Sequence, residues 1–236
     1  MTTPRSFPND NTTAHPAHLY DAGVRQVIPH YDAIHAETLD LVRSVVGEPA
    51  LWLDTGCGTG ALVERALPRF PRTRFALADP SDAMLGQARE RFRREPGGRV
   101  TVLPATGSNG LPAIEPRLRA QVVSAVLCHH YLDPEGRAAA VRGCFEVLEP
   151  GGALVVVENV DADSERGREL GLRRWRDFQI AQGRSPEAVA QHLARFGTEL
   201  KPVRVAEHLA VLRAAGFSTV ELFWRAQMQA GFLAVK

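Results

Sequence analysis

The chain has 236 residues, with 28 basic and 27 acidic side chains and a formal net charge of +1. This length fits one α/β domain with a modest insertion, large enough to bury about 70% of its unfolded surface. Because basic and acidic side chains balance, the protein has no strong positive electrostatic field that would attract a polyanion, so we expect no nucleic acid partner.

Two further classes are argued against by the pattern of apolar residues and cysteines. No apolar run approaches the roughly 18 residues that a membrane span requires, and the N-terminus does not show the pattern of a signal peptide. Cys57, Cys128 and Cys144 have neither metal nor disulfide spacing, which favours reduced thiols. We therefore expect a cytoplasmic protein, monomer or homodimer, with no membrane contact and no metal site.

The N-terminal part of the chain divides into a polar segment and a helical one. Residues 1–16 hold three prolines and few large apolar side chains, so we expect them to be flexible. Residues 17–48 carry apolar residues at helical spacing, interrupted at Pro29. This pattern predicts two cap helices at the start of a single domain covering 17–236.

From Leu51 onward, strands and helices alternate as in a doubly wound parallel sheet. After residue 160 this alternation ends, and residues 162–203 read as a helical insertion that covers the strand ends as a lid. A further helix, about 205–214, precedes a closing antiparallel hairpin. The expected strands are 51–54, 74–79, 99–103, 122–128, 153–159, 218–224 and 229–235, and the expected helices between the first five are 60–69, 81–94 and 134–148.

The most informative segment is LWLDTGCGTG, residues 51–60. An apolar strand ends on an acid, turns through three glycines at alternate positions and enters a helix. Such a turn lets a ligand approach the backbone where no Cβ intervenes. The second strand also ends on an acid, Asp79, which is placed to accept hydrogen bonds from ribose hydroxyls.

The glycines alone fit two cofactors. Gly56, Gly58 and Ala61 also satisfy a dinucleotide fingerprint. Asp54 separates the two readings, because a carboxylate there would repel a pyrophosphate and attract an ammonium group. We therefore favour S-adenosylmethionine over a nicotinamide dinucleotide, with a turn-making role as the structural alternative for Asp54.

With these motifs in order, the chain resembles the class I S-adenosylmethionine-dependent methyltransferases. The resemblance rests on residues 53–60, 78–84, 148–152 and the final hairpin, and it covers about 20–236. It implies a Rossmann-like sheet of seven strands, mostly parallel with an antiparallel last strand. The segment 27–31 and the residues 223–225 resemble a sub-branch near the carboxy-S-adenosylmethionine synthases.

The resemblance also implies which residues hold the cofactor. Asp54 and Gly56 would bind the methionine end, and Gly58 would let the backbone pass close to the ligand. Asp79 would take the ribose hydroxyls and Met84 would cover the adenine. The loop 104–108 lacks the aspartate that many members use for adenine, which leaves Thr106, Ser108 or the backbone. The remaining positions expected to contact the cofactor are Cys57, Pro80, Cys128, Tyr31 and Arg25.

Methyl transfer is an in-line displacement on a donor that already carries its leaving group, so the protein mainly aligns the acceptor and excludes water. A base is needed only for an acceptor that must lose a proton. His129, His130 and Tyr131 follow the fourth strand, at the edge of the sheet where ligands bind, and are the catalytic candidates. The alternative for the histidine pair is packing or helix capping.

Several other side chains are candidates for contact with a small-molecule acceptor. Glu158 and Asn159 end the fifth strand, with a loop hydrogen-bonding role as the alternative. Trp175 lies on the insertion, where aromatic residues also serve as core. Arg225, like Arg25, can bind a carboxylate through two hydrogen bonds or form a surface ion pair. Tyr20 belongs to the cap helices.

The leading hypothesis is a methyltransferase acting on a small molecule. A carboxy-S-adenosylmethionine synthase is the second hypothesis, and it would need an arginine for its carboxylate donor. A non-catalytic S-adenosylmethionine-binding protein and a nicotinamide-dependent dehydrogenase remain as further alternatives. The sequence does not identify the acceptor atom.

Overall fold

The computed structural model describes residue 13, residues 15–114 and residues 117–236. The expected flexible segment 1–16 lies mostly outside these ranges. One mixed sheet has the strand order β3-β2-β1-β4-β5-β8-β7, and β6 pairs with the end of β5. The first five strands of this order are parallel, and β8 is antiparallel to both β5 and β7. The Rossmann-like sheet with an antiparallel last strand is therefore confirmed.

The strands and helices follow the expected alternation along the chain. The strands are β1 Leu51–Thr55, β2 Arg74–Ala78, β3 Val100–Val102, β4 Ala120–Val126, β5 Leu148–Asp161, β6 Val203–Arg204, β7 Thr219–Ala226 and β8 Gln229–Val235. The helices are α1 Tyr20–Val27, α2 Tyr31–Val45, α3 Ala61–Ala66, α4 Asp82–Phe92, α5 Leu111–Ile114, α6 Pro134–Val147, α7 Glu165–Ala181, α8 Pro186–Leu193 and α9 Val205–Ala214, with short 3-10 turns η1 Ala17–Leu19, η2 Ser108–Gly110 and η3 His129–Tyr131.

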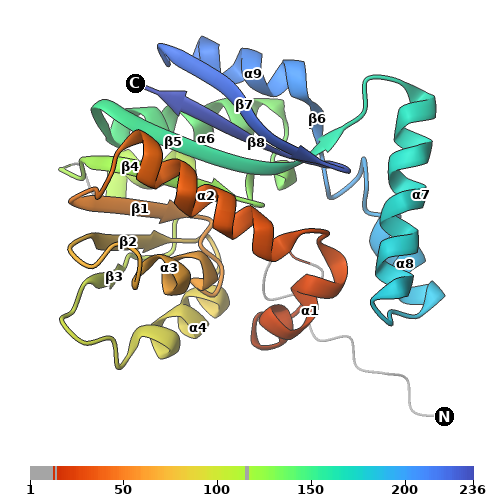
Figure 1. Cartoon of the computed structure of the whole chain (residues 1–236), viewed down its shortest axis with the longest axis horizontal. Helices are drawn as coiled ribbons and strands as arrows, with labels where there is room; N and C mark the ends of the chain where they lie inside the picture. Colours follow the sequence, from red (N-terminus) through yellow and green to blue (C-terminus); the bar gives the residue numbers. More distant parts are fainter. Residues whose placement is uncertain (1–12, 14, 115–116) are drawn as a thin grey trace.

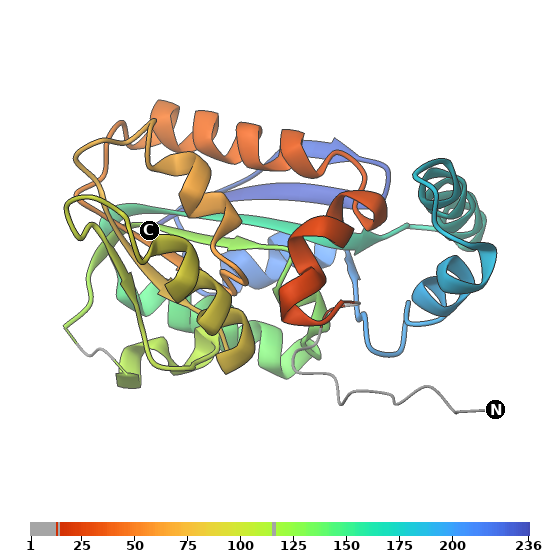
Figure 2. The same cartoon turned by 90° about the horizontal axis from the view of Figure 1, so that it is seen from below.

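The sheet is covered on both faces. Figure 2 shows α2 and α3 on one side of the sheet and α6 and α9 on the other. On the α2 side, Trp52 and Phe75 pack with Leu39 and Val42. Successive side chains of a strand point to opposite faces of the sheet, so an apolar strand covered on both sides buries both faces. Each layer therefore encloses its own core.

Short capping motifs fix where the helices begin. Ser81 accepts a hydrogen bond from the backbone N–H of Met84, and Asp133 accepts one from Gly136. Side-chain oxygens at these positions satisfy otherwise unpaired helix N–H groups. These capping side chains set the first residues of α4 and α6. The two helices follow β2 and β4, which end at the same edge of the sheet.

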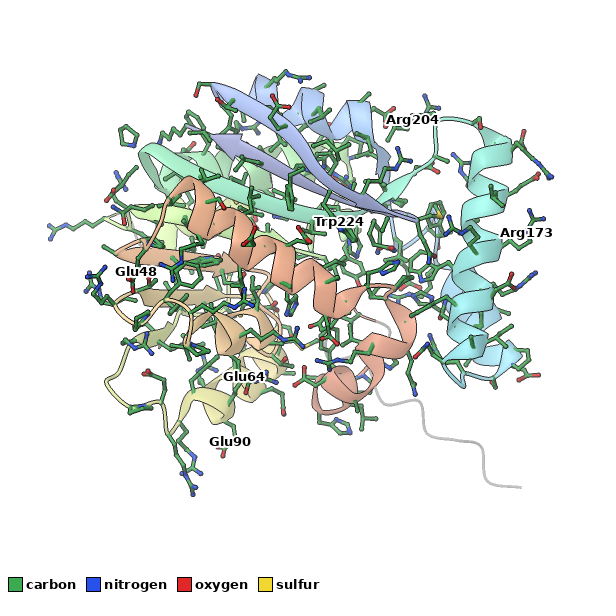
Figure 3. All side chains as sticks on the ribbon, in the orientation of Figure 1. Glu48, Glu64, Glu90, Arg173, Arg204 and Trp224 are labelled. Atoms are coloured by element: carbon green, nitrogen blue, oxygen red, sulfur yellow. The ribbon has the colours of Figure 1, made fainter. Side chains whose placement is uncertain are left out.

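The cap helices and the insertion meet beyond the carboxyl ends of the parallel strands (Figure 1). The indole N–H of Trp175, on α7, donates a 2.6 Å hydrogen bond to the carbonyl of Val27 at the end of α1. Trp224 of β7 lies beside the α1–α2 junction, with its ring centroid 6.4 Å from that of His30 (Figure 3). The two segments that the sequence separates by more than a hundred residues thus form one cover over this edge.

Differences from the expected elements are local. β5 begins at Leu148, ahead of the turn through Pro150 and Gly151, because Leu148 already pairs with Ala120 of β4 before a shift in register. The short elements η2, α5 and β6 were not predicted, because no local pattern of residues marks them. Every helix within the described ranges is too short or too polar to traverse a bilayer.

Candidate functional site

A cavity of about 430 Å³ lies at the carboxyl ends of β1, β2 and β4. Its walls come from the glycine turn, α1, α2, α4 and η2. Ligands of α/β sheets bind at this edge, where the strand order reverses. Among the described residues, the lining includes two carboxyl groups, Asp54 and Asp79, and neither arginine nor lysine.

Asp54 is held by a chain of buried hydrogen bonds. The Trp52 indole N–H donates to Ser124 Oγ at 2.8 Å, and the Ser124 hydroxyl donates to Asp54 Oδ1 at 2.5 Å. Burial raises the pKa of Asp54 to about 7, the charge of Asp79 adds to this effect, and the Ser124 hydrogen bond opposes it. A cation in the cavity would stabilise the ionised form of this carboxyl group.

Two glycines leave the floor of the cavity open. Gly56 and Gly58 both have left-handed backbone, with φ of 61° and 55°. A Cβ on Gly56 would lie 2.3 Å from Cys128 Cβ, whereas no atom lies within 4 Å of a Cβ built on Gly58. Glycine at Gly56 thus permits close packing against Cys128, and at Gly58 it exposes the backbone to the ligand.

Asp79 connects the glycine turn to α4. Its Oδ2 accepts a 2.9 Å hydrogen bond from the Gly58 N–H, and its Oδ1 accepts one of the same length from Ser81. Burial raises the pKa of Asp79, and these two backbone donors oppose the rise. Each carboxylate oxygen can accept more than one hydrogen bond, so both oxygens of Asp79 keep a lone pair for ribose hydroxyls.

One wall of the cavity, where the resemblance places the adenine, is formed by α4 and η2. Met84 and Pro80 line it from one side, with Gly107, Ser108 and Asn109 from the other. Thr106 does not line the cavity; its N–H donates to the Asp79 carbonyl and its hydroxyl to Gly107. The loop without the expected aspartate therefore offers Ser108 and Asn109 at this position.

The cap contributes two tyrosines and η3 a third. Tyr20, Tyr31 and Tyr131 all line the cavity, and burial raises the pKa of each phenol. They are therefore neutral near pH 7. Tyr20 and Tyr131 also line a smaller chamber of about 30 Å³, which adjoins the main cavity and is large enough for a water molecule.

His130, Asn159 and Glu158 form a fixed hydrogen-bonded chain at this side chamber. Glu158 Oε2 lies 2.6 Å from His130 Nδ1, and the Glu158 carboxylate also accepts the backbone N–H groups of His129 and His130 at 2.9 Å. Asn159 Nδ2 lies 3.3 Å from His130 Nε2, while Asn159 Oδ1 accepts from Gln229. This chain favours a proton on Nδ1 and a lone pair on Nε2.

Glu158 stays ionised in spite of its burial. Burial alone would raise its pKa, but the interaction with His130, including the 2.6 Å hydrogen bond with its Nδ1, lowers it. A carboxylate that orients an imidazole also stabilises the imidazolium that forms when Nε2 accepts a proton. The geometry therefore suits a general base, reached through the side chamber.

The structure brings some predicted site residues together and places others elsewhere. Cys57 and Cys128 line the cavity with the residues above. The His129 ring is bonded to Ser108 at 2.8 Å and lies outside both the cavity and the chamber. Trp175 packs against the cap helices and against His192 of α8, outside the cavity. Arg25 pairs with Asp32 at 3.0 Å on the surface.

Arg225, on β7, lies on an outer groove near α7 rather than at the cavity. Sequence reasoning did not name several residues that line the cavity, among them Thr13, His35, Leu62 and Asn109. Helical spacing from Tyr31 could have identified His35, because a residue four positions later lies on the same face of the helix.

Fold and site together define a Rossmann-like protein whose cavity suits a nucleoside cofactor that carries a positive charge. Asp79 can hold a ribose, the open backbone at Gly58 admits the ligand, and the Asp54 carboxyl group faces where an ammonium would lie. The described lining contains neither arginine nor lysine that could neutralise the charge of two phosphates. These features fit S-adenosylmethionine and disfavour a dinucleotide.

Comparisons with known proteins agree. Residues 53–152 match the family model described as a methyltransferase domain. A carboxy-S-adenosyl-L-methionine synthase of Pseudomonas syringae is 30% identical over 204 residues, which covers 84% of this chain and 81% of the relative. The chain therefore belongs to the class I S-adenosylmethionine-dependent methyltransferases, and its cofactor is S-adenosylmethionine.

Solved structures support the same fold. An O-methyltransferase family protein from Burkholderia thailandensis superposes with a TM-score of 0.65 at 18% identity, over 92% of this chain. Human N-acetylserotonin methyltransferase in complex with SAM gives 0.57 at 17% identity, over 93% of this chain. The chain spans 58% and 65% of the lengths of these two proteins.

Proposed function

We propose that this protein transfers the methyl group of S-adenosylmethionine to a small-molecule acceptor. The observation that carries the proposal is the position of the side chamber, which shares Tyr20 and Tyr131 with the cofactor cavity and is also lined by His130. Bound S-adenosylmethionine supplies an electrophilic methyl group on a good leaving group. The protein then has to orient the acceptor and receive its proton.

Each part of the site has a task in this proposal. Asp54 and Asp79 fix the cofactor, while Tyr20 and Tyr131 form the wall between cofactor and acceptor. His130 takes the proton of a hydroxyl, phenol or amine acceptor, and Glu158 stabilises the resulting positive charge. The caps exclude water, which strengthens these electrostatic interactions.

The test is methyl transfer from labelled S-adenosylmethionine to a panel of phenols, hydroxylated heterocycles and amines. We expect label in at least one class, with S-adenosylhomocysteine as the second product. Cofactor binding without transfer to any acceptor, in parallel with an active control methyltransferase, would instead support the non-catalytic alternative.

A carboxy-S-adenosylmethionine synthase-like activity is the second candidate, and it is favoured by the named relatives. It needs a cation beside the reacting methyl group. No arginine of the described residues lines the main cavity, but Arg195 lines the side chamber, where it pairs with Glu199 at 2.9 Å. That ion pair already neutralises the Arg195 guanidinium, which favours methyl transfer instead.

Mass spectrometry separates the two candidates. The cofactor that copurifies with the protein is released by denaturation and weighed. S-adenosylmethionine or S-adenosylhomocysteine is expected for a methyltransferase, whereas a cofactor heavier by a carboxyl group would establish the synthase-like reaction.

A further inference from the structure

We infer that His35 is a cofactor-binding residue that donates a hydrogen bond to the carboxylate of the methionine tail. His35 lies on α2, one turn after Tyr31, and its ring centroid is 4.5 Å from that of Tyr31. Both side chains line the main cavity. The inference concerns the cofactor alone, so it holds for a methyltransferase, a synthase-like enzyme or a binding protein.

The first argument is that the His35 imidazole is polar, buried and short of partners. The side chain is 3% exposed, and its Nδ1 has no hydrogen-bond partner among the described residues. An unpaired polar group in the interior costs free energy, so native structures rarely leave one without a ligand or water. If position 35 only filled the core, leucine would serve better than histidine, because it has no polar atom to leave unpaired.

The second argument is position. α2 lies over β1 together with α3, and Leu62 of α3 lines the same wall of the cavity. The adenine wall, formed by Met84 and Asn109, belongs to α4 and η2 on other elements. His35 therefore faces the half of the cavity that holds Gly56 and Asp54, where the methionine tail lies.

The third argument is charge. The tail carries a carboxylate, and a buried carboxylate requires hydrogen-bond donors. The described lining supplies no arginine or lysine. Burial lowers the pKa of His35 to about 3, and the charge of Arg65 acts in the same direction. The imidazole is thus neutral in the empty site and offers one N–H beside the Tyr31 phenol.

The experiment compares two ligands by calorimetry, S-adenosylhomocysteine and its decarboxylated analogue, which lacks only the carboxylate. For the unaltered protein we expect the analogue to bind more weakly. His35→Leu should weaken S-adenosylhomocysteine by about tenfold or more, the effect of one hydrogen bond to a charged group, and leave the analogue unchanged. His35→Asn, which keeps a donor, should recover most of the loss.

Thr38→Val is the matched control, because Thr38 is buried on the same helix, does not line the cavity, and bonds only to the Ile34 carbonyl. We expect it to affect neither ligand by itself. An equal loss of both ligands in His35→Leu, or equal affinity of His35→Leu and unaltered protein for S-adenosylhomocysteine, would overturn the inference. Failure of the proposed methyl transfer would appear separately, as cofactor binding without turnover.

Discussion

Asp54 and Ser124 stand opposite each other in the parallel register of β1 and β4, and the Ser124 hydroxyl donates a 2.5 Å hydrogen bond to the Asp54 carboxyl group. Trp52, two residues before Asp54, donates in turn to the same hydroxyl oxygen, which leaves the serine proton directed at the carboxylate. The pKa of Asp54 is therefore set in part by hydrogen bonds from neighbouring residues of the sheet.

Ser124→Ala should weaken cofactor binding near neutral pH. Without its hydroxyl donor, the pKa of Asp54 rises further above about 7, and less carboxylate is available to the ammonium group. We expect the dissociation constant of S-adenosylhomocysteine at pH 7 to rise by roughly tenfold. Calorimetry at pH 6.5 and 8.5 should show a smaller loss at the higher pH, where both proteins ionise; a loss independent of pH would contradict this explanation.

Asp54→Asn should stabilise the protein without cofactor while abolishing tight binding. The pKa of Asp54 rises from 3.8 in the unfolded chain to about 7 in the folded one. The contribution of the protonated Asp54 carboxyl group to the free energy of unfolding is therefore fully present below pH 4, and it is lost as the pH rises through 7. At pH 8 the substitution should recover up to about 4 kcal/mol of this loss. Thermal unfolding at pH 5 and pH 8 checks it, and equal shifts at both pH values would refute it.

Asp79→Ala should remove the ribose contact and loosen the glycine turn. Each hydrogen bond lost to this carboxylate costs about 1.5–3 kcal/mol, and Gly58 loses its side-chain partner at the same time. We expect weaker binding of S-adenosylhomocysteine together with a lower melting temperature. Asp82→Ala, at an exposed acid three residues later, is the control for net charge. An unchanged dissociation constant for Asp79→Ala would argue against the assignment.

His130→Ala should abolish turnover and retain cofactor binding. The imidazole lines the side chamber and not the cofactor cavity, so its removal takes away the proton acceptor alone. General-base catalysis typically contributes about 10²–10⁴-fold to a rate. The readouts are the methylation rate with an acceptor from the panel and the affinity for S-adenosylhomocysteine. Full activity in the variant would reduce the histidine to a structural role.

Asp21→Ala should speed the release of the cofactor. Asp21 joins α1 to the glycine turn, because its Oδ1 accepts a 2.7 Å hydrogen bond from the Thr59 hydroxyl and its Oδ2 pairs with Arg91 of α4. Glu64 pairs with the same arginine at 2.7 Å from α3 and is labelled in Figure 3. Stopped-flow dissociation of S-adenosylhomocysteine should be several-fold faster in Asp21→Ala and unchanged in Glu64→Ala. Equal rates in both would show that the contact does not hold the cap.

The sequence predicted the sheet, and it predicted that Asp54, Gly58 and Asp79 meet at one cavity, because those features depend on local patterns. The alternation of apolar strands and helices, the Pro29 break and the caps at Ser81 and Asp133 are each encoded within a few residues. Asp54, Gly58 and Asp79 lie at strand ends, and the topology alone brings them to one edge.

The acceptor side was less predictable, because it depends on contacts between segments far apart in the chain. Glu158 decides which of the two adjacent histidines lines the side chamber. It accepts hydrogen bonds from the backbone N–H groups of both, and it holds the ring of His130. Trp175 and Arg25 have residue types that suit a site, yet the hydrogen bond to Val27 and the pairing with Asp32 occupy them elsewhere. His35 needed the packing of α2 on α3 to be noticed.

The bond between the Trp175 indole and the Val27 carbonyl has a consequence for how ligands enter. Moving α7 away from α1 would leave a buried donor and a buried acceptor without hydrogen-bond partners. We therefore expect the two segments to move together. Entry through the seam between them is thereby disfavoured.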